Sequence, residues 1–131
     1  MGEREELNKL TEGIIGAAID VHRNLGPGSL ESAYQAALAY ELNQRSYKVE
    51  QQKPLPMLYK EIKLDAGYRL DFLVNDKVVL EIKSSDKIIP IHDAQILSYL
   101  RLSGCKVGLL INFNVKLLKN GIKRFINGSL D

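Results

Sequence analysis

The sequence predicts an α/β fold in which a mixed central β-sheet is flanked by helices on both faces. Three observations support this prediction. Apolar residues recur at steps of three and four through about the first 45 positions, which is the period of an amphipathic helix. The runs 68–74 and 78–83 contain apolar residues with the period of two that is typical of strands. The continuous apolar run KVGLLIN, at 106–112, is typical of a strand that is covered on both faces.

Two helices are expected before the first strand. The first spans about residues 7–25 and ends at the Gly26-Pro27-Gly28 turn. Its inward stripe consists of Leu7, Leu10, Ile14, Ala18, Val21 and Leu25. Ser29 is a suitable N-cap for a second helix that runs to about Arg45. The apolar side of this second helix is predicted to consist of Leu30, Ala33, Ala37 and Leu38.

The rest of the chain alternates strands with one helix. The extended region 47–59 contains Pro54 and Pro56, so we expect it at an edge of the sheet or with a bulge. The strands at 68–74 and 78–83 follow. Pro90 begins a third helix, which Gly104 ends. Its inward residues are predicted to be Ile91, Ala94, Leu97 and Leu100. The strand at 106–112 and a short strand at 122–126 complete the sheet.

The composition excludes several classes of protein. Of the 131 residues, 45% are hydrophobic and 26% are charged, which is typical of a globular chain and not of a disordered one. We therefore expect one domain over residues 1–131, with a core over about 10–127. The formal net charge of +2 is small, so any contact with nucleic acid has to come from a local patch of positive charge.

The single cysteine, Cys105, excludes an intrachain disulfide and is predicted to be a small core residue. With no signal-peptide pattern in MGEREELNK, this predicts a cytoplasmic protein. No apolar stretch approaches 18 residues, so no membrane association is expected. Cysteine and histidine do not cluster at ligand spacing, so zinc is not expected.

The register of the hairpin formed by 68–74 and 78–83 follows from its hydrophobic pattern. A two-residue turn at Asn75-Asp76 would place charged and apolar side chains together on both faces. A three-residue turn sets Val74 opposite Val78. One face is then wholly apolar and consists of Leu70, Phe72, Val74, Val78, Leu80 and Ile82. The pattern therefore selects the three-residue turn.

In this register Asp71 lies opposite Glu81, and Arg69 lies opposite Lys83. Like charges that face each other across a ladder cost about 0.2–1 kcal/mol, and burial raises that cost. A divalent cation held between the two carboxylates would remove the repulsion. The pairing alone leaves a second interpretation open, in which the charges lie on a solvated sheet face. The apolar neighbours Leu73 and Val79 favour a covered face.

Three short motifs carry a resemblance to a known family. Asp71 is followed ten positions later by Glu81-Ile82-Lys83, which resembles the core pattern of the PD-(D/E)XK nuclease superfamily, with Leu70 where its name has proline. The segment from Gly28 to Tyr34 reads G-x-x-E-x-x-Y and is similar to the GxxExxY family of that superfamily. Gln95-Ile96-Leu97-Ser98-Tyr99 reads Q-x-x-x-Y, a motif similar to one in RecB-type nucleases.

The resemblance implies a restriction-endonuclease-like core and a set of site residues. Its catalytic residues would be Asp71, Glu81, Lys83 and Gln95. Its Mg²⁺ or Mn²⁺ ligands would be Glu31, Asp71, Glu81 and the carbonyl of Ile82. Its substrate contacts would include Arg69, His92 and Tyr99. Structural roles stay open for three of these residues: Glu31 as a first-turn glutamate, His92 near a helix N-terminus, and Tyr99 as a half-buried helix tyrosine.

The resemblance also implies a function, which is metal-dependent hydrolysis of phosphodiester bonds in nucleic acid, DNA rather than RNA. Candidate phosphate contacts are Arg69, Lys87, Arg101, Lys106 and Lys116. The alternatives are a catalytically silent module that binds nucleic acid or a protein, and a plain α/β domain. A second copy of the chain or an unknown protein partner could complete the substrate groove.

Overall fold

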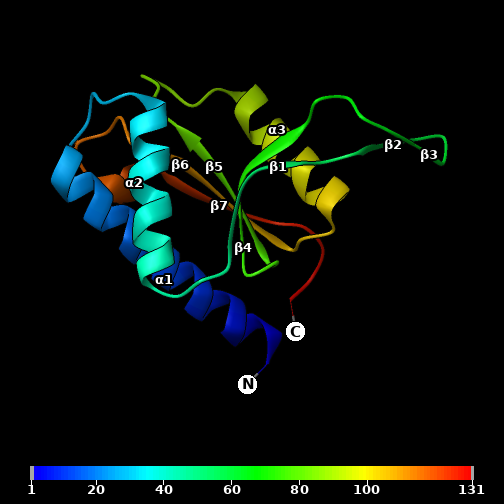
Figure 1. The fold of residues 1–131 in the computed structure, drawn as a ribbon, viewed down its shortest axis with the longest axis horizontal. Helices are drawn as coiled ribbons and strands as arrows, with labels where there is room; N and C mark the ends of the chain where they lie inside the picture. The colour runs from blue at the N-terminus through cyan, green and yellow to red at the C-terminus, as the bar shows by residue number, and fades with distance from the viewer. Residues whose placement is uncertain (1, 131) are drawn as a thin grey trace.

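The computed structural model describes residues 2–130, which form a mixed five-stranded sheet with helices on both faces (Figure 1). The helices are α1 (Glu3–Leu25), α2 (Glu31–Gln44), α3 (Pro90–Ser103) and the short 3₁₀ helix η1 (Leu118–Gly121). The strands are β1 (Val49–Pro54), β2 (Met57–Tyr59), β3 (Ile62–Leu64), β4 (Arg69–Val74), β5 (Val78–Lys83), β6 (Val107–Asn112) and β7 (Ile122–Ile126).

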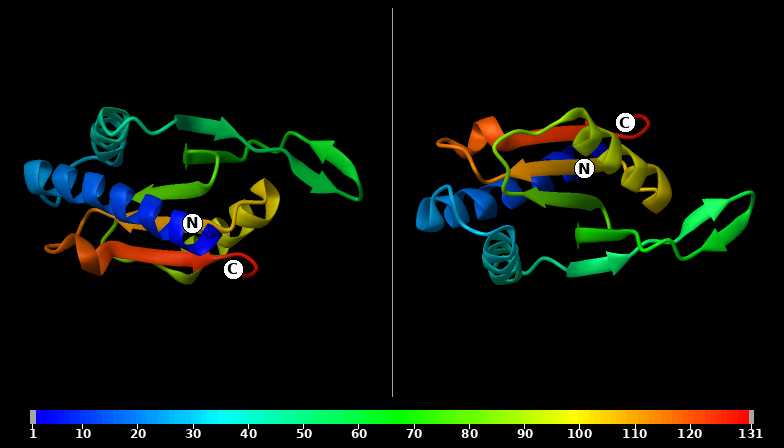
Figure 2. Two further views of the ribbon diagram at one scale, coloured as in Figure 1. Left: turned by 90° about the horizontal axis from the view of Figure 1, so that it is seen from below. Right: turned by 90° about the horizontal axis from the view of Figure 1, so that it is seen from above.

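The strand order of the main sheet is β1-β4-β5-β6-β7. The β5–β6 pair is parallel and the other pairs are antiparallel, because α3 is the crossover between β5 and β6. Helices α1 and α2 pack on one face of the sheet, and α3 packs on the other (Figure 2). All six residues of β6 are buried, which confirms the prediction from KVGLLIN. The predicted fold class is therefore confirmed.

Helix α2 is anchored beside the end of β5. The ring of Tyr34 is buried and stacks on Phe113, with 4.5 Å between the ring centroids. The hydroxyl of Ser84, the residue after β5, donates a hydrogen bond of 2.9 Å to the carbonyl oxygen of Ser29. These contacts place the N-terminus of α2, and hence the G-x-x-E-x-x-Y segment, at the end of the sheet where β5 ends.

Two details of α2 differ from the prediction. Its N-cap is Leu30, with no side-chain cap, so Ser29 does not have the capping role expected of it. Leu30 is also 74% exposed, while the buried side chains are Tyr34, Leu38, Ala39 and Leu42. Leu38 is thus buried as predicted and Ala37 packs against the core, but the inward face is turned toward Tyr34, which buries more apolar area than Ala33 would.

The prediction for α3 is right in its bounds and right in part for its inward face, because Leu100 is buried and Leu97 packs against the core. Ile91 is 65% exposed and Ala94 is also exposed, whereas the buried residues are Ile96, Tyr99 and Leu100. Gly108 of β6 explains the difference. A Cβ at Gly108 would lie 3.1 Å from Ile96 Cδ1 and 3.2 Å from Leu100 Cδ2. The absent side chain thus lets this face of α3 approach the sheet closely.

The predicted hairpin register is confirmed for three residue pairs, Phe72↔Leu80, Leu73↔Val79 and Val74↔Val78. The ladder then ends. Asp71 and Glu81 do not continue it, and Arg69 pairs with Pro54 of β1 instead of lying opposite Lys83. Leu70 joins the cluster under α3, although strict alternation assigned it to the other face. The two strands separate at Asp71.

The region 47–64 holds a feature that the sequence pattern did not predict. Strand β1 is at the sheet edge, as its prolines indicated. Beyond it, β2 and β3 form a separate hairpin that projects from the body of the molecule (Figures 1 and 2). Lys60 and Glu61 form its turn, and both have positive φ. Tight hairpin turns favour this conformation, but Lys-Glu is not a typical turn sequence.

Candidate active site

Asp71 and Glu81 meet where the β4–β5 ladder ends. The main-chain N–H of Ile82 donates a hydrogen bond of 2.8 Å to Oδ2 of Asp71. The main-chain N–H of Asp71 donates one of 3.4 Å to Oε1 of Glu81. Each carboxyl group therefore accepts a hydrogen bond from the backbone of the opposite strand, in place of the missing ladder bonds. The two side chains lie close together, as predicted. Hydrogen bonds from backbone N–H groups to the two carboxyls hold them there, and the strand pairing itself does not reach them.

Burial makes both carboxyl groups hard to ionise. Glu81 is 5% exposed, and burial together with the charge of Asp71 raises its pKa to about 8. Burial also raises the pKa of Asp71, against the opposing effects of the Ile82 N–H and Lys83. Near neutral pH, this raised pKa favours the protonated form of Glu81. A buried pair of this kind can bind a proton or a cation, but it is unfavourable with both groups ionised and nothing between them.

Lys83 lies on the same face, at the end of β5. Its ammonium is close enough to both carboxyl groups to lower their pKa values. Even so, within residues 2–130 it forms no ion pair within 4 Å. The Lys83 side chain is half-buried. The Lys83 ammonium therefore lies near the carboxyl pair but forms no direct ion pair with either group.

Gln95 and Tyr99 approach the pair from α3. Gln95 Nε2 donates a hydrogen bond of 2.9 Å to the Tyr99 hydroxyl. Tyr99 is buried, and burial and then the charge of Glu81 raise its pKa. The ring of Tyr68 contacts that of Tyr99 edge-on, at 6.0 Å between centroids. The structure therefore brings Asp71, Glu81, Lys83, Gln95 and Tyr99 to one face of the sheet.

The remaining predicted site residues are Glu31, His92, Arg69 and Ile82. Glu31 is exposed in the first turn of α2, and residues 2–130 contain no cluster of three His, Cys, Asp or Glu side chains that could hold a metal ion. His92 accepts a hydrogen bond of 3.2 Å at Nδ1 from the N–H of Ile89, so it caps α3. Arg69 is exposed at the start of β4. The main-chain N–H of Ile82 donates a hydrogen bond to the Asp71 carboxyl.

The predicted phosphate contacts are divided between the two ends of the sheet. Lys106 precedes β6 at the end where β5 begins, and it forms an ion pair of 2.7 Å with Glu3. It therefore lies at the opposite end of the sheet from Lys83. Lys87 and Lys116 are exposed in the segments that follow β5 and β6, at the same end as Lys83. Arg101 is exposed on α3 and donates to Ser98.

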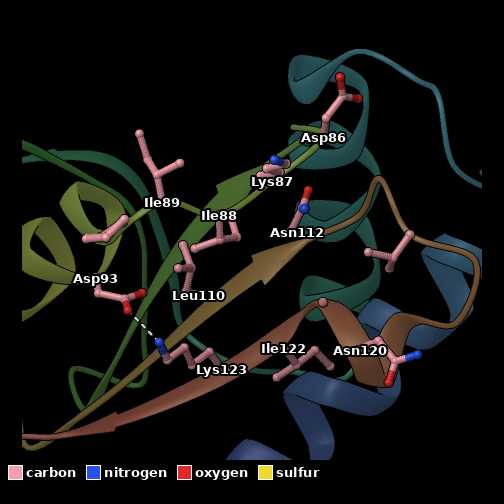
Figure 3. A pocket seen from close by; sticks show the side chains of 13 residues that line it. Asp86, Lys87, Ile88, Ile89, Asp93, Leu110, Asn112, Asn120, Ile122 and Lys123 are labelled. Atoms are coloured by element: carbon pink, nitrogen blue, oxygen red, sulfur yellow. Dashed lines mark hydrogen bonds and ion pairs between the residues drawn. The ribbon is translucent and has the colours of Figure 1, made fainter.

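A hollow of about 430 Å³ lies on the same face of the sheet, over β6 and β7 (Figure 3). Its floor includes Leu110, which pairs with Glu81 on one side and with Lys123 on the other. Lys123 forms an ion pair with Asp93 of α3 at the rim. Asn112 binds both the N–H and the carbonyl of Ser85, at 3.1 and 2.9 Å. Asn112 thereby fixes the segment that follows Lys83.

Sequence reasoning missed Gln52 of β1. It lies opposite Asp71, its side chain acts on the Asp71 carboxyl, and it donates a hydrogen bond of 2.9 Å to Gln35 of α2. No pattern in the sequence marks it, because glutamine in an edge strand is ordinary. Only its backbone conformation, with φ of 50°, distinguishes it.

The comparisons with known proteins bear on the whole of this site. A family model for the PD-(D/E)XK nuclease superfamily matches residues 8–125, a range that includes every residue discussed from Glu31 to Lys123. A search of curated proteins and a search of solved structures found no match. No helix within residues 2–130 combines the length and hydropathy that crossing a membrane requires.

Proposed function

The chain belongs to the PD-(D/E)XK nuclease superfamily, and from that premise we propose that it is a metal-dependent nuclease that hydrolyses phosphodiester bonds of DNA. The observation that supports the proposal most is the buried Asp71–Glu81 pair at the point where two strands separate. The G-x-x-E-x-x-Y segment that begins at Gly28 supports a finer assignment, to the GxxExxY family. Its place beside the end of β5 is consistent with that assignment.

The donor set fits Mg²⁺ or Mn²⁺. Both ions prefer oxygen ligands, and Mg²⁺ is usually held by one or two carboxylates with water and phosphate completing the shell. Asp71 and Glu81 would be the protein ligands, and a cation would replace the proton of Glu81. The Ile82 carbonyl and Glu31 are further candidates. When bound, the cation supplies Lewis-acid chemistry by polarising the phosphate and offsetting its negative charge.

The side chains around the Asp71–Glu81 pair would orient the attacking water and stabilise charge on the phosphate. Lys83 has no ion-pair partner within 4 Å among residues 2–130, so its ammonium is free to orient the attacking water and to stabilise charge on the phosphate. Gln95 would hold the water with its amide group. Tyr99, buried and bonded to Gln95, would keep that amide in place.

Exposed basic side chains near the site would bind the substrate. Lys87, Lys116 and Arg69 are exposed and would contact phosphates on either side of the scissile bond. Contacts of this kind release counterions from the nucleic acid, so binding would weaken steeply with salt. DNA is proposed by resemblance to the superfamily, and the assay below compares it with RNA. The same assay would show whether the protein cuts internally or from an end.

The test is cleavage of supercoiled plasmid, linear duplex, single-stranded DNA and RNA in Mg²⁺ and in Mn²⁺. The wild type is compared with Glu81→Ala and with Asp76→Ala, which removes an exposed turn carboxylate that pairs with Lys48. We expect the wild type and Asp76→Ala to cut, and Glu81→Ala to be inactive. Equal cleavage by all three would refute the assigned site. If none cuts, while wild type and Glu81→Ala bind nucleic acid equally, the silent binding module becomes the better account.

A further inference from the structure

Gln52 has an unusual backbone for its place in the fold. Six non-glycine residues among 2–130 have positive φ, and five of them lie in turns: Ser46, Lys60, Glu61, Asn75 and Asp76. Gln52, with φ of 50°, is the one that lies inside a strand. Left-handed backbone costs a residue with a Cβ about 1 kcal/mol or more, and such strain persists only where surrounding contacts hold it. The contacts made by Gln52 therefore need an explanation.

The position of Gln52 in the ladder is directly opposite Asp71. Gln51 pairs with Phe72 and Lys53 pairs with Leu70, so the register is unbroken on either side. The break in regular conformation is confined to the one residue that faces Asp71. Across the same point, β4 also separates from β5. Asp71 thus lies between two irregularities, one in each neighbouring strand.

The side chain of Gln52 connects Asp71 to α2. It is near enough to the Asp71 carboxyl to lower the pKa of that group. Its Nε2 donates a hydrogen bond of 2.9 Å to Oε1 of Gln35. Gln35 lies four positions after Glu31, on the same side of α2. One amide group therefore joins the carboxyl pair to the helix that carries the G-x-x-E-x-x-Y motif.

These contacts restrict the Asp71 carboxyl from two directions. The Ile82 N–H holds Oδ2 from β5. The Gln52 amide acts from β1. A carboxyl held by one donor alone can still rotate about its Cα–Cβ and Cβ–Cγ bonds, and an amide beside it on another strand restricts that rotation. Restricted rotation matters for a group that must present an oxygen to a cation.

We propose that Gln52 is a positioning residue of the nuclease centre, which orients Asp71 for a divalent cation and couples it to α2. The proposal rests on the proposed function, because it takes Asp71 as a metal ligand. A plain structural role, in which Gln52 only ties β1 to α2, makes a different prediction. It would affect stability and leave metal affinity unchanged.

The test uses Gln52→Gly, which removes both the amide and the backbone strain, and Ser46→Gly, which removes left-handed strain in a turn. Mn²⁺ affinity is measured by calorimetry, with thermal unfolding and DNA cleavage in parallel. We expect Gln52→Gly to fold and to bind Mn²⁺ about tenfold or more weakly, since loss of a group that orients a ligand costs about 10–100-fold. Ser46→Gly should bind Mn²⁺ as the wild type does.

A second variant keeps the test decisive if Gln52→Gly fails to fold. Gln52→Asn tolerates left-handed backbone and keeps an amide one methylene shorter, so it should also bind Mn²⁺ more weakly. Wild-type Mn²⁺ affinity in either Gln52 variant would overturn the inference while leaving the nuclease proposal in place. If the wild type itself binds no Mn²⁺ and cuts nothing, the proposed function fails and the role of Gln52 fails with it.

Discussion

Oδ2 of Asp71 accepts its hydrogen bond from the main-chain N–H of Ile82, a group that a regular β4–β5 pairing would use in the ladder. The side-chain carboxyl of Asp71 has replaced a backbone carbonyl of β4 as the acceptor for this donor on β5. This exchange separates the strands, buries Glu81 and leaves Asp71 half-exposed beside it. The chemistry proposed for the site follows from this local exchange.

The metal-free protein should lose stability as pH rises from about 4.5 to 8. The pKa of Glu81 is about 8 in the folded protein, against an ordinary value of 4.5. Within that window the folded state keeps a proton that the unfolded chain has released, so rising pH favours unfolding, by at most about 1.4 kcal/mol per pH unit. Urea unfolding at several pH values, with EDTA present, measures this slope. In Glu81→Gln the slope should largely vanish, and a wild-type stability that rises with pH would contradict the assignment.

Mn²⁺ should raise the unfolding temperature, and more so at pH 8 than at pH 6. Carboxylate ligands must lose their protons to bind a metal, so affinity increases as Glu81 ionises. At a hundred times its dissociation constant, the ion would stabilise the folded state by about 2.7 kcal/mol. Thermal unfolding with and without Mn²⁺ at the two pH values gives the comparison. Glu81→Ala should show no shift at either pH, and a shift as large as that of the wild type would place the metal elsewhere.

Lys83→Met should abolish cleavage and preserve metal binding. Methionine keeps much of the length of the side chain and removes the ammonium that would contact the water and phosphate. Loss of such a group costs about 10²–10⁴-fold in rate. Single-turnover cleavage measures the rate, and Mn²⁺ calorimetry on the same protein measures the site. Near-normal cleavage by Lys83→Met would reduce Lys83 to a charge that neighbours the carboxyl pair.

Substitutions of Gln95 and Tyr99 should have different effects, because Gln95 would contact the attacking water and Tyr99 would only hold Gln95 in place. Gln95→Ala removes the amide proposed to hold the water and should lower kcat by about 10²-fold or more. Tyr99→Phe removes only the hydroxyl bonded to Gln95, so it should cost about 1 kcal/mol of stability and a smaller part of the rate. Steady-state kinetics and urea unfolding of both variants test the distinction. A larger rate loss in Tyr99→Phe would assign the direct contact to the tyrosine.

Gly108→Ala should destabilise the fold by about 1–3 kcal/mol, because the new Cβ would press on Ile96 and Leu100 of α3. Gly16→Ala is the matched control. It lies in α1, where a Cβ would meet nothing within 4 Å, so the same change should stabilise that helix by up to about 1 kcal/mol. Urea unfolding of both variants decides the sign. A neutral Gly108→Ala would mean that α3 can shift away from β6 at little cost.

Much of the fold could be predicted because local patterns specify it. The C-terminal end of α1 and the bounds of α3, β5 and β7 follow from periodicity and from the glycines and prolines that flank them, whereas α1 begins at Glu3, before its first apolar residue of the stripe. The three-residue turn between β4 and β5 follows from the rule that one sheet face stays apolar. In the candidate site, the proximity of Asp71 and Glu81 came from that register argument, and the other proposed roles came from the resemblance.

The inward face of α1 follows its periodicity from Leu7 to Val21, with Leu25 at its end exposed, but those of α2 and α3 could be predicted only in part. In α3, two neighbouring apolar stripes compete, and the choice depends on Gly108, a residue on another element that makes room for Ile96. The projecting β2–β3 hairpin and the left-handed Gln52 also have no local signal. Each depends on contacts between segments that lie far apart in the chain.

By itself, the sequence determined the class of fold, the order of its elements and the pairing of β4 with β5, because hydrophobic periodicity and turn chemistry act over a few residues. Only the tertiary structure decided where that pairing ends. At Asp71 a side-chain carboxyl competes with the backbone for the Ile82 N–H, and Gln52 reaches it from a third strand. Contacts from two neighbouring strands to one carboxyl depend on the arrangement of all three strands in space, and the pattern of any one strand does not contain them.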